Sequence, residues 1–412
     1  MLFLIFSGIN LSVLGQVNDY THWIKFDQSY LKIEISKDGI YRLGYSDLKD
    51  AGLTSFKNIS LLHHGEPVKL LAHNEIAGEL QKDGYIEFYA EKNHGVLDSL
   101  VYRPRKRNNP FNSLFSDLAT YFITNADELP LRADTLISNA TIATTAYYTE
   151  SMLYAPNTQY SLNNSIGLLP VIQQSFYEPG EGWSGEFATT DTTKKIDFFL
   201  PDFVKSNSKT KVYLSLNGRS RLFHNLNLSL NTKIVRNRIS IPPFGVYIDT
   251  LEDNSGLQNL SFEIKGNNKG AFDWYSVNYI QIKYPKSFGA ALTTRPYELP
   301  LKDSLCIFKN PGQNASVYDI SDPNNIRKVL IKDNSEYQYF KSNQDATIYI
   351  SDAVQKPKIA GLVSFKKRSF KPEYLIISHK SLKESAEAWA SYRSSKAGGE
   401  YKCGVVYIED LY

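Results

Sequence analysis

The sequence predicts a mainly β chain: an N-terminal β-rich domain, a central antiparallel β-sandwich of jelly-roll type, a small β segment, and then the start of an α/β domain. Three observations predict it. Aromatic residues make up 13% of the 412 residues, with 28 tyrosines among them, and flat rings suit the pleated surface of a sheet. Short stretches of alternating apolar and polar residues recur through most of the chain. Near the C-terminus a strand, a helix and a strand follow one another.

Length and composition set the number of domains and exclude some functions. A chain of 412 residues exceeds the size at which one core keeps growing, so we expect two to four domains. The net charge of +3 comes from well-mixed charges and gives no footprint for nucleic acid. One basic cluster, residues 103–107, could touch a polyanion, but no aromatic platform accompanies it and a solvated loop is the simpler interpretation. The expected segments are a signal peptide (1–15), an N-terminal β-rich domain (16–145), a β-sandwich (146–300), a small β domain (301–370) and the start of an α/β domain (371–412).

Residues 1–15 carry no charge and are rich in Leu, Ile and Phe. The small-residue spacing of Val13-Leu14-Gly15 before Gln16 is typical of a signal-peptidase site. The run is too short for a comfortable membrane span. We therefore expect an exported protein, although no Lys or Arg follows Met1 and the natural start could lie upstream. Nothing later in the sequence is apolar for long enough to predict a membrane span.

The N-terminal region begins with a hairpin signal. Leu31, Ile33 and Ile35 alternate with charged residues, and Lys37-Asp38-Gly39 offers a tight turn into a second strand at residues 40–43. A short helix is expected at 46–51. Further strands are expected at residues 60–62, 68–71, 85–89 and 121–124.

The central region contains alternating segments at regular intervals, which favour an antiparallel sandwich or jelly roll. Turn residues such as Asn217-Gly218 and Gly266-Asn267-Asn268 separate them. The expected strands are residues 195–200, 211–216, 226–230, 261–264 and 277–284. A smaller β segment follows at about 304–365.

In the last residues the spacing of the apolar side chains changes. The continuous apolar run Tyr374–Ser378 predicts a strand covered on both faces. Ser381, with Glu384 three residues later, predicts an N-cap and capping box, and Gly398-Gly399 predicts the end of the helix. Residues 403–408 predict a second buried strand. A parallel sheet needs more than two strands, so we expect the chain to be a fragment that stops inside a domain.

The motifs that could carry chemistry are weak. Residues 180–185 match G-x-G-x-x-G, but no helical stripe follows, so a turn-rich loop is favoured over a dinucleotide site. His63-His64 is more simply a strand end than a metal pair, because adjacent side chains of a strand point to opposite faces. His379 ends a parallel-type strand, where α/β proteins place ligands, although a strand edge without function is commoner. Cys306 lies in an apolar run that favours strand core over a nucleophile.

Three further sets of residues give only weak signals. Residues 93–98 place polar oxygens around a glycine but lack the ligand spacing of a calcium loop. Trp23, Trp183 and Trp274 could form a carbohydrate platform, although core packing is commoner. The only cysteines, Cys306 and Cys403, are too few for a disulfide scaffold, and a bridge between them is the weaker alternative. We therefore predict no catalytic, cofactor-binding or metal-binding residue and no cofactor in this chain.

A resemblance to a known family rests on several short motifs in order. Val317-Tyr318-Asp319-Ile320-Ser321-Asp322-Pro323 resembles the segment that precedes gingipain-type cysteine peptidase domains. Residues 374–378, 386–390 and 405–412 look like the opening of that peptidase domain. Residues 38–43 and 83–89, with 180–183 and 280–285, resemble the N-terminal region and sandwich of PorU-like sortases of the type IX secretion system.

This resemblance implies a function for the whole protein. Such sortases remove the C-terminal signal from secreted cargo at the outer membrane, with a caspase-like domain in which a His activates a Cys nucleophile. No residue here matches that His or Cys, and neither His64 nor Cys403 fills the role. The chain is then expected to be the non-catalytic N-terminal part, located at the outer membrane or cell surface, with secretion subunits and cargo as partners. The alternative is a secreted β-sandwich adhesin or carbohydrate-binding module.

Overall fold

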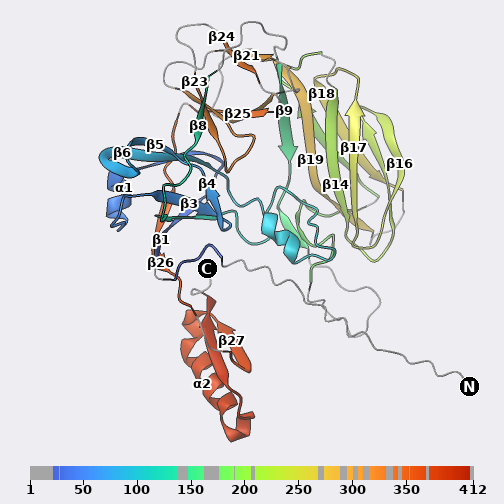
Figure 1. The fold of residues 1–412 in the computed structure, drawn as a ribbon. Coiled ribbons are helices and arrows are strands. Elements are labelled where there is room, and N and C mark those ends of the chain that lie inside the picture. Colours follow the sequence, from blue (N-terminus) through green and yellow to red (C-terminus); the bar gives the residue numbers. More distant parts are fainter. Residues whose placement is uncertain are drawn as a thin grey trace, which may run out of the picture.

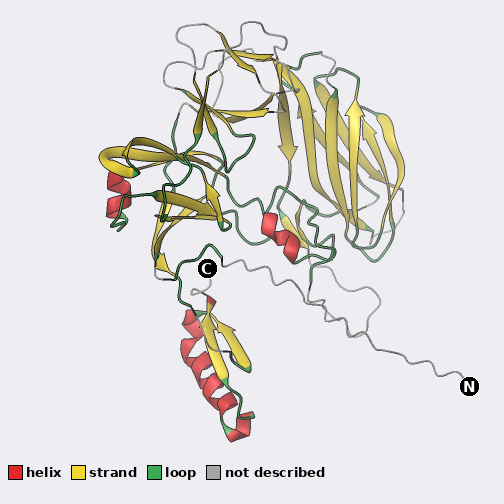
Figure 2. Cartoon of the chain, viewed as in Figure 1, coloured by secondary structure: helices red, strands yellow, loops and turns green. Residues whose placement is uncertain are grey.

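The computed structural model describes residues 22–26, 28–137, 147–161, 176–189, 191–205, 209–267, 273–287, 295–299, 305–309, 315–330, 337–341, 346–351, 353–367 and 371–408. The signal peptide expected at 1–15 lies outside them. Within these ranges the fold is mainly β, with several antiparallel sheets and few helices (Figures 1 and 2). This confirms the predicted fold class. No helix in these ranges is long and apolar enough to cross a membrane.

The N-terminal region contains two sheets that share one core. One has the order β26-β1-β7-β3-β4 and the other β2-β6-β5. Alternate apolar side chains of the strands, such as Leu31, Ile33 and Phe88, are buried between them, and Leu48 of the helix packs on the same core. The elements are β1 (Ser29–Ile35), β2 (Gly39–Gly44), α1 (Tyr45–Asp50), β3 (Ile59–His63), β4 (Glu66–Val68), β5 (Leu71–Ile76), β6 (Glu79–Ala90), η1 (Val96–Leu100), β7 (Ala119–Asn125) and β26 (Lys358–Ser364).

The predicted hairpin around Lys37-Asp38-Gly39 is wrong. β1 pairs with β26 on one edge and β7 on the other, while β2 pairs with β6 in the second sheet. Both edges of β1 are therefore occupied, and the turn leads the chain from one sheet to the next. The Asp38 carboxylate is held by distant groups: it accepts hydrogen bonds from the Lys92 backbone N–H (2.8 Å) and from His94 Nε2 (3.0 Å).

The central region is a sandwich of two sheets. A four-stranded sheet, β13-β18-β15-β16, faces a ten-stranded one, and apolar side chains such as Leu214, Phe262 and Ile282 fill the space between them. The strands of these two sheets are β8 (Asp134–Ile137), β9 (Tyr147–Tyr154), β12 (Ala188–Thr189), β13 (Thr193–Phe199), β14 (Thr210–Gly218), β15 (His224–Leu230), β16 (Lys233–Ile241), β17 (Val246–Asp253), β18 (Asn259–Gly266), β19 (Trp274–Ser287), β20 (Arg295–Leu299), β22 (Ser316–Asp319), β23 (Arg327–Leu330) and β25 (Ala346–Ser351). Two separate two-stranded sheets pair β10 (Gln159–Ser161) with β11 (Gly182–Ser184) and β21 (Leu305–Lys309) with β24 (Tyr337–Lys341).

Strand pairing runs across the boundaries expected at 145 and 300, whereas β27 and β28, beyond 370, pair only with each other. The ten-stranded sheet has the order β17-β14-β19-β9-β20-β25-β22-β23-β8, with β12 beside β19. It therefore joins strands from all three expected β domains. β26 lies in the segment expected to be the small β domain, yet it pairs with β1 near the start of the chain. The division of the chain into folding units stays a prediction.

The C-terminal elements are β27 (Tyr374–Ser378), η2 (Lys380–Leu382), α2 (Lys383–Ser394), η3 (Lys396–Gly398) and β28 (Cys403–Tyr407). β27 and β28 are parallel, so the predicted strand–helix–strand unit is confirmed. In Figure 1 this unit, drawn in red and orange, stands apart from the β sheets.

Two details of this unit differ from expectation. The cap is His379, whose Nδ1 accepts from the Ser381 backbone N–H (3.1 Å), because a 3₁₀ turn precedes α2 and moves Ser381 inside it. α2 itself begins after Leu382, without a side-chain cap. β27 is covered on one face only, since Leu375 and Ile377 are 52% and 59% exposed.

Candidate functional site at the junction of the β regions

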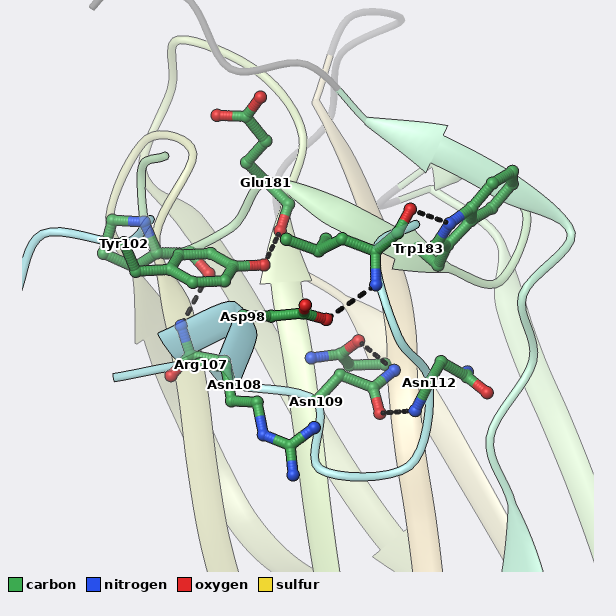
Figure 3. Close-up of a pocket in the computed structure, with 11 residues that line it drawn as sticks. Asp98, Tyr102, Arg107, Asn108, Asn109, Asn112, Glu181 and Trp183 are labelled. Carbon is green, nitrogen blue, oxygen red and sulfur yellow. Dashed lines mark hydrogen bonds between the residues drawn. The ribbon is translucent and has the colours of Figure 1, made fainter. Parts of the chain in front are cut away.

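A small polar cavity lies where the loops after β6 meet the sandwich. Figure 3 shows the side chains around it. Its free volume of about 10 Å³ is close to the space one water molecule occupies, so it cannot admit a substrate. The lining residues are Asp98, Tyr102, Arg107, Asn108, Asn109, Asn112, Leu114, Pro179, Glu181, Trp183 and Asn278.

Hydrogen bonds across this cavity join the two β regions. Tyr102 Oη donates to the Glu181 carbonyl (2.8 Å), and Trp183 Nε1 donates to the Leu114 carbonyl (3.2 Å). Asn109 Nδ2 donates to Asn278 Oδ1 of β19 (3.1 Å). The cavity is therefore the centre of a fixed connection between the regions.

Asp98 organises the N-terminal side of this junction. Its side chain is buried and accepts a hydrogen bond from the Leu114 backbone N–H (2.8 Å), which ties η1 to the loop before β7. Asn93 Oδ1 accepts from the Gly95 N–H (2.8 Å), so residues 93–95 form a side-chain-capped turn. Nothing in this geometry gathers oxygens for calcium.

Arg219 organises the sandwich side of the junction. Its guanidinium is buried and donates from Nε to Ser276 Oγ (2.9 Å), from Nη2 to Ser184 Oγ (2.9 Å) and from Nη1 to the Gly180 carbonyl. Burial lowers the pKa of Arg219 to about 10, so the group stays charged at neutral pH. Every side-chain acceptor found for it in the described residues is neutral.

The G-x-G-x-x-G segment belongs to this network. It forms a turn and β11, no helix follows it, and a Cβ on Gly182 would lie 2.8 Å from Leu114 Cδ2. Gly182 also has φ +118°, a conformation that glycine adopts without strain. Glycine at this position thus allows close approach of two protein segments.

A second polar cluster ties the β1–β2 corner to the end of β6. His94 Nε2 lies 3.0 Å from both carboxylate oxygens of Asp38, and the Arg107 guanidinium donates to the His94 carbonyl. The hydrogen bond with Asp38 raises the pKa of His94. For Asp38, burial raises the pKa, but the hydrogen bonds from His94 and Lys92 outweigh it and the pKa is lowered. Burial, followed by the nearby Asp38 charge, raises the pKa of Glu91.

The His63-His64 pair lies at the end of β3. His64 has φ +51°, which turns its ring onto His63 (centroids 3.8 Å apart), and His63 also stacks on Tyr121 (3.9 Å). The expectation that the two side chains point to opposite faces is therefore wrong, because the strand ends between them. Burial, then the neighbouring His64, lowers the pKa of His63 to about 4. Among the described residues no three His, Cys, Asp or Glu side chains are placed to hold a metal ion.

The structure also contains a buried His–Asp pair that no motif in the sequence indicates. His224 Nδ1 is hydrogen-bonded to Asp273 Oδ1, and both side chains are almost fully buried. Burial lowers the pKa of His224 in spite of the carboxylate. Such a pair resembles part of a catalytic triad, but both side chains are buried, with exposures of 0% and 1%.

The three tryptophans differ in exposure. Trp183 packs edge-on against Tyr160, and Trp23 packs among the rings of Tyr30, Phe122 and Phe365, so both serve packing. Trp274 is 37% exposed and lies beside Phe187.

Cys403 and His379 stay apart from both polar clusters. Cys403 is a free, half-buried thiol, and the Cys306 side chain lies outside the described residues. His379 caps η2 through Ser381. Neither His379 nor Cys403 is joined to the junction by a hydrogen bond among the described residues.

Among known proteins, only solved structures are similar to this chain. No protein-family model and no curated protein sequence matches the chain. The chain is similar to dimeric latent PorU from Porphyromonas gingivalis, with a TM-score of 0.59 and 18% identity over 93% of this chain and 37% of PorU. It thus spans little more than a third of that protein's length.

Two other solved structures overlap more weakly. A family 35 carbohydrate binding module from Clostridium thermocellum has a TM-score of 0.18 and 10% identity, covering 33% of this chain and 90% of the module. The ANXUR2 extracellular domain from Arabidopsis thaliana has a TM-score of 0.22 and 10% identity, covering 64% of this chain and 80% of the domain. Scores this low support no argument about fold. The PorU comparison does support one: over 93% of its length, this chain has a PorU-like fold.

Proposed function

We propose that the chain is the non-catalytic N-terminal part of a gingipain-like cysteine peptidase, a sortase that processes the C-terminal signals of type IX secreted cargo at the cell surface. The observation that carries this proposal is the PorU-like fold over 93% of the chain. The parallel β27–α2–β28 unit at its end supports it, since this is how an α/β peptidase domain would begin.

In this proposal the chain positions the cargo or the secretion subunits and carries no catalytic residue for the cleavage. The junction built on Asp98 and Arg219 holds the N-terminal β region and the sandwich in one arrangement, which would present a constant surface to cargo or to secretion subunits. The Cys nucleophile and His base of such a peptidase would come from residues that have no match in this sequence. Cys403 is a free thiol without a histidine hydrogen-bonded to it among the described residues.

A deletion in the cells that make the protein tests the proposal. Removing residues 147–287 in frame should leave cargo with its C-terminal signal uncleaved, which immunoblotting and mass spectrometry of the cargo would show. Cys403→Ala in the intact gene is the control and should process cargo normally. Normal processing without the sandwich, or loss of processing in Cys403→Ala, would refute the proposal.

A second candidate is a carbohydrate-binding module, favoured by one observation. Trp274 is 37% exposed and its ring centroid lies 6.4 Å from that of Phe187, so two aromatic rings lie together at one end of the sandwich. If this candidate is right, Trp274→Ala abolishes binding on a glycan array while the circular dichroism spectrum stays unchanged. Absence of any glycan binding by the unaltered protein removes the candidate.

A further inference from the structure

Five large apolar side chains are exposed on two neighbouring segments after β6. Three belong to the short helix η1, drawn in cyan in Figure 1, and two to the loop before β7. Exposed groups of this kind mark surfaces that meet a partner or a membrane more often than isolated exposed residues do. Their exposed fractions are 58% for Val96, 54% for Leu97, 41% for Leu100, 68% for Phe115 and 44% for Leu118.

These two segments form one surface because they are bonded together. The Asp98 carboxylate accepts from the Leu114 N–H, so η1 and the residues before Phe115 are fixed to each other. Phe115 lies edge-on to Tyr177 (6.3 Å), and Tyr177 in turn lies edge-on to Tyr102 (5.7 Å). With Asp98 turned inward, the outward side chains of η1 are Val96, Leu97 and Leu100.

Three cations flank this apolar group. Arg103, Arg105 and Lys106 are all exposed, and none forms an ion pair with another described residue. Arg103 Nη1 donates to the Leu100 carbonyl (3.1 Å), which places one cation directly at the end of η1.

The carboxylates of this segment are already engaged. Residues 96–118 carry four cations and only two carboxylates. Asp98 is buried in the junction, and Asp117 lies 3.5 Å from Lys92. The cations of residues 96–118 therefore outnumber the carboxylates there, and the exposed cations have no ion-pair partner among the described residues.

We propose that this basic–apolar face, formed by Val96, Leu97, Leu100, Phe115 and Leu118 with Arg103, Arg105 and Lys106, docks on the surface of an anionic phospholipid membrane. Apolar side chains at the tips of tight turns fit the boundary between headgroups and acyl chains, and flanking cations fit the phosphate layer. None of these eight residues is a tryptophan and Phe115 is the one aromatic ring among them, so the face offers no platform on which successive bases of a nucleic acid could stack. The charge complementarity therefore favours lipid.

Vesicle flotation tests the proposal with the full chain. The probe is vesicles of phosphatidylcholine with one quarter phosphatidylglycerol, compared with pure phosphatidylcholine. The protein should float with the anionic vesicles at low salt, bind them less as salt is raised, and bind neutral vesicles much more weakly.

Two variants separate the contributions of charge and apolar surface. Arg103→Gln/Arg105→Gln/Lys106→Gln should lower the apparent affinity by about a hundredfold, because each cation near an anionic surface contributes about fivefold. Leu97→Ser/Leu100→Ser/Phe115→Ser should lower it by at least about tenfold, since each of the three apolar groups would be lost from the interface. All six target side chains are exposed, so melting temperatures should stay unchanged.

Matched controls alter the same residue types elsewhere. Lys49→Gln/Lys233→Gln/Lys265→Gln removes three exposed cations, and Leu222→Ser/Phe223→Ser removes two exposed apolar side chains. Both controls should bind vesicles as the unaltered protein does. The proposal is overturned if the unaltered protein does not float, if neutral and anionic vesicles are bound equally, or if the controls lose as much binding as the targeted variants.

Discussion

Arg219 places a charged side chain inside the protein among neutral acceptors. Each of its hydrogen bonds involves a charged donor, and removing such a donor leaves the buried Gly180 carbonyl without its partner. We expect Arg219→Ala to lower the free energy of unfolding by about 3 kcal/mol, through the lost bonds and the space left behind. Thermal unfolding followed by circular dichroism measures the effect.

The matched control is Arg221→Ala, two residues along the same loop. Arg221 is exposed, so its removal should change the melting temperature little. Equal melting temperatures for the Arg219 and Arg221 variants would show that the buried guanidinium has no structural importance.

His94 and Asp38 give the N-terminal region a pH-dependent contact. The pKa of His94 is raised, so its contribution to stability is complete below its unfolded pKa and is lost as pH rises through the folded value. The pKa of Asp38 is lowered, so its contribution exists above its unfolded pKa and is lost as pH falls through the folded value. His94→Ala should therefore lower the melting temperature more at pH 5.5 than at pH 8.5.

Because His94→Ala is compared with the unaltered protein at the same pH, the effects of other titrating groups on the melting temperature cancel. His63, whose pKa is lowered to about 4, destabilises the fold as pH falls below about 6.5, but it does so in both proteins. Asp38→Asn should reproduce the loss seen with His94→Ala at pH 5.5, and combining the two changes should add little. A His94→Ala effect that is the same at both pH values would contradict this account.

At the scale of elements, the end of β14 and the start of β15 come together only because residue 218 is a glycine. A Cβ at Gly218 would lie 2.4 Å and 2.5 Å from atoms of the His224 ring and 2.8 Å from the Pro242 carbonyl oxygen. The His224 ring is held by Asp273 and the carbonyl belongs to the backbone, so neither can move aside cheaply. Gly218→Ala should lower the free energy of unfolding by about 3 kcal/mol.

A suitable control is Gly44→Ala. Gly44 has φ −79°, and the nearest atom to an added Cβ is 3.4 Å away, so we expect a change within about 0.5 kcal/mol. Chemical denaturation of the two variants side by side gives the comparison. A Gly218→Ala protein as stable as Gly44→Ala would mean that the two strand ends can separate without loss.

The strands also show which features of the fold the sequence alone could predict. Strands such as β14, β15 and β19 could be predicted, because alternation of apolar residues is a local signal. The partner of each strand could not: Lys37-Asp38-Gly39 has turn chemistry, yet β1 pairs with β26 more than three hundred residues later. The same limit applies to the junction, where Arg219 meets Gly180 and Asp98 meets Leu114 only after folding.

At the scale of the whole molecule, long-range pairing closes the N-terminal region. β26 completes the sheet that begins with β1, and Trp23, Tyr30 and Phe365 pack together beside that pairing. The chain thus leaves this region after β7, builds the sandwich and returns before it enters β27. This return explains why a division by sequence position alone cuts through the sheets.

The same topology predicts where a protease can separate the chain. β27, α2 and β28 pack against one another and share no sheet with the β regions, while Lys366 and Lys367 are exposed just after β26. Limited trypsin digestion should therefore release a C-terminal fragment of about 45 residues by cleavage after one of these lysines, as mass spectrometry would show. The remaining fragment should keep the melting temperature of the intact chain, because β26 and its pairing with β1 are retained. A large fall in that temperature would mean that the C-terminal unit contributes to the stability of the β regions.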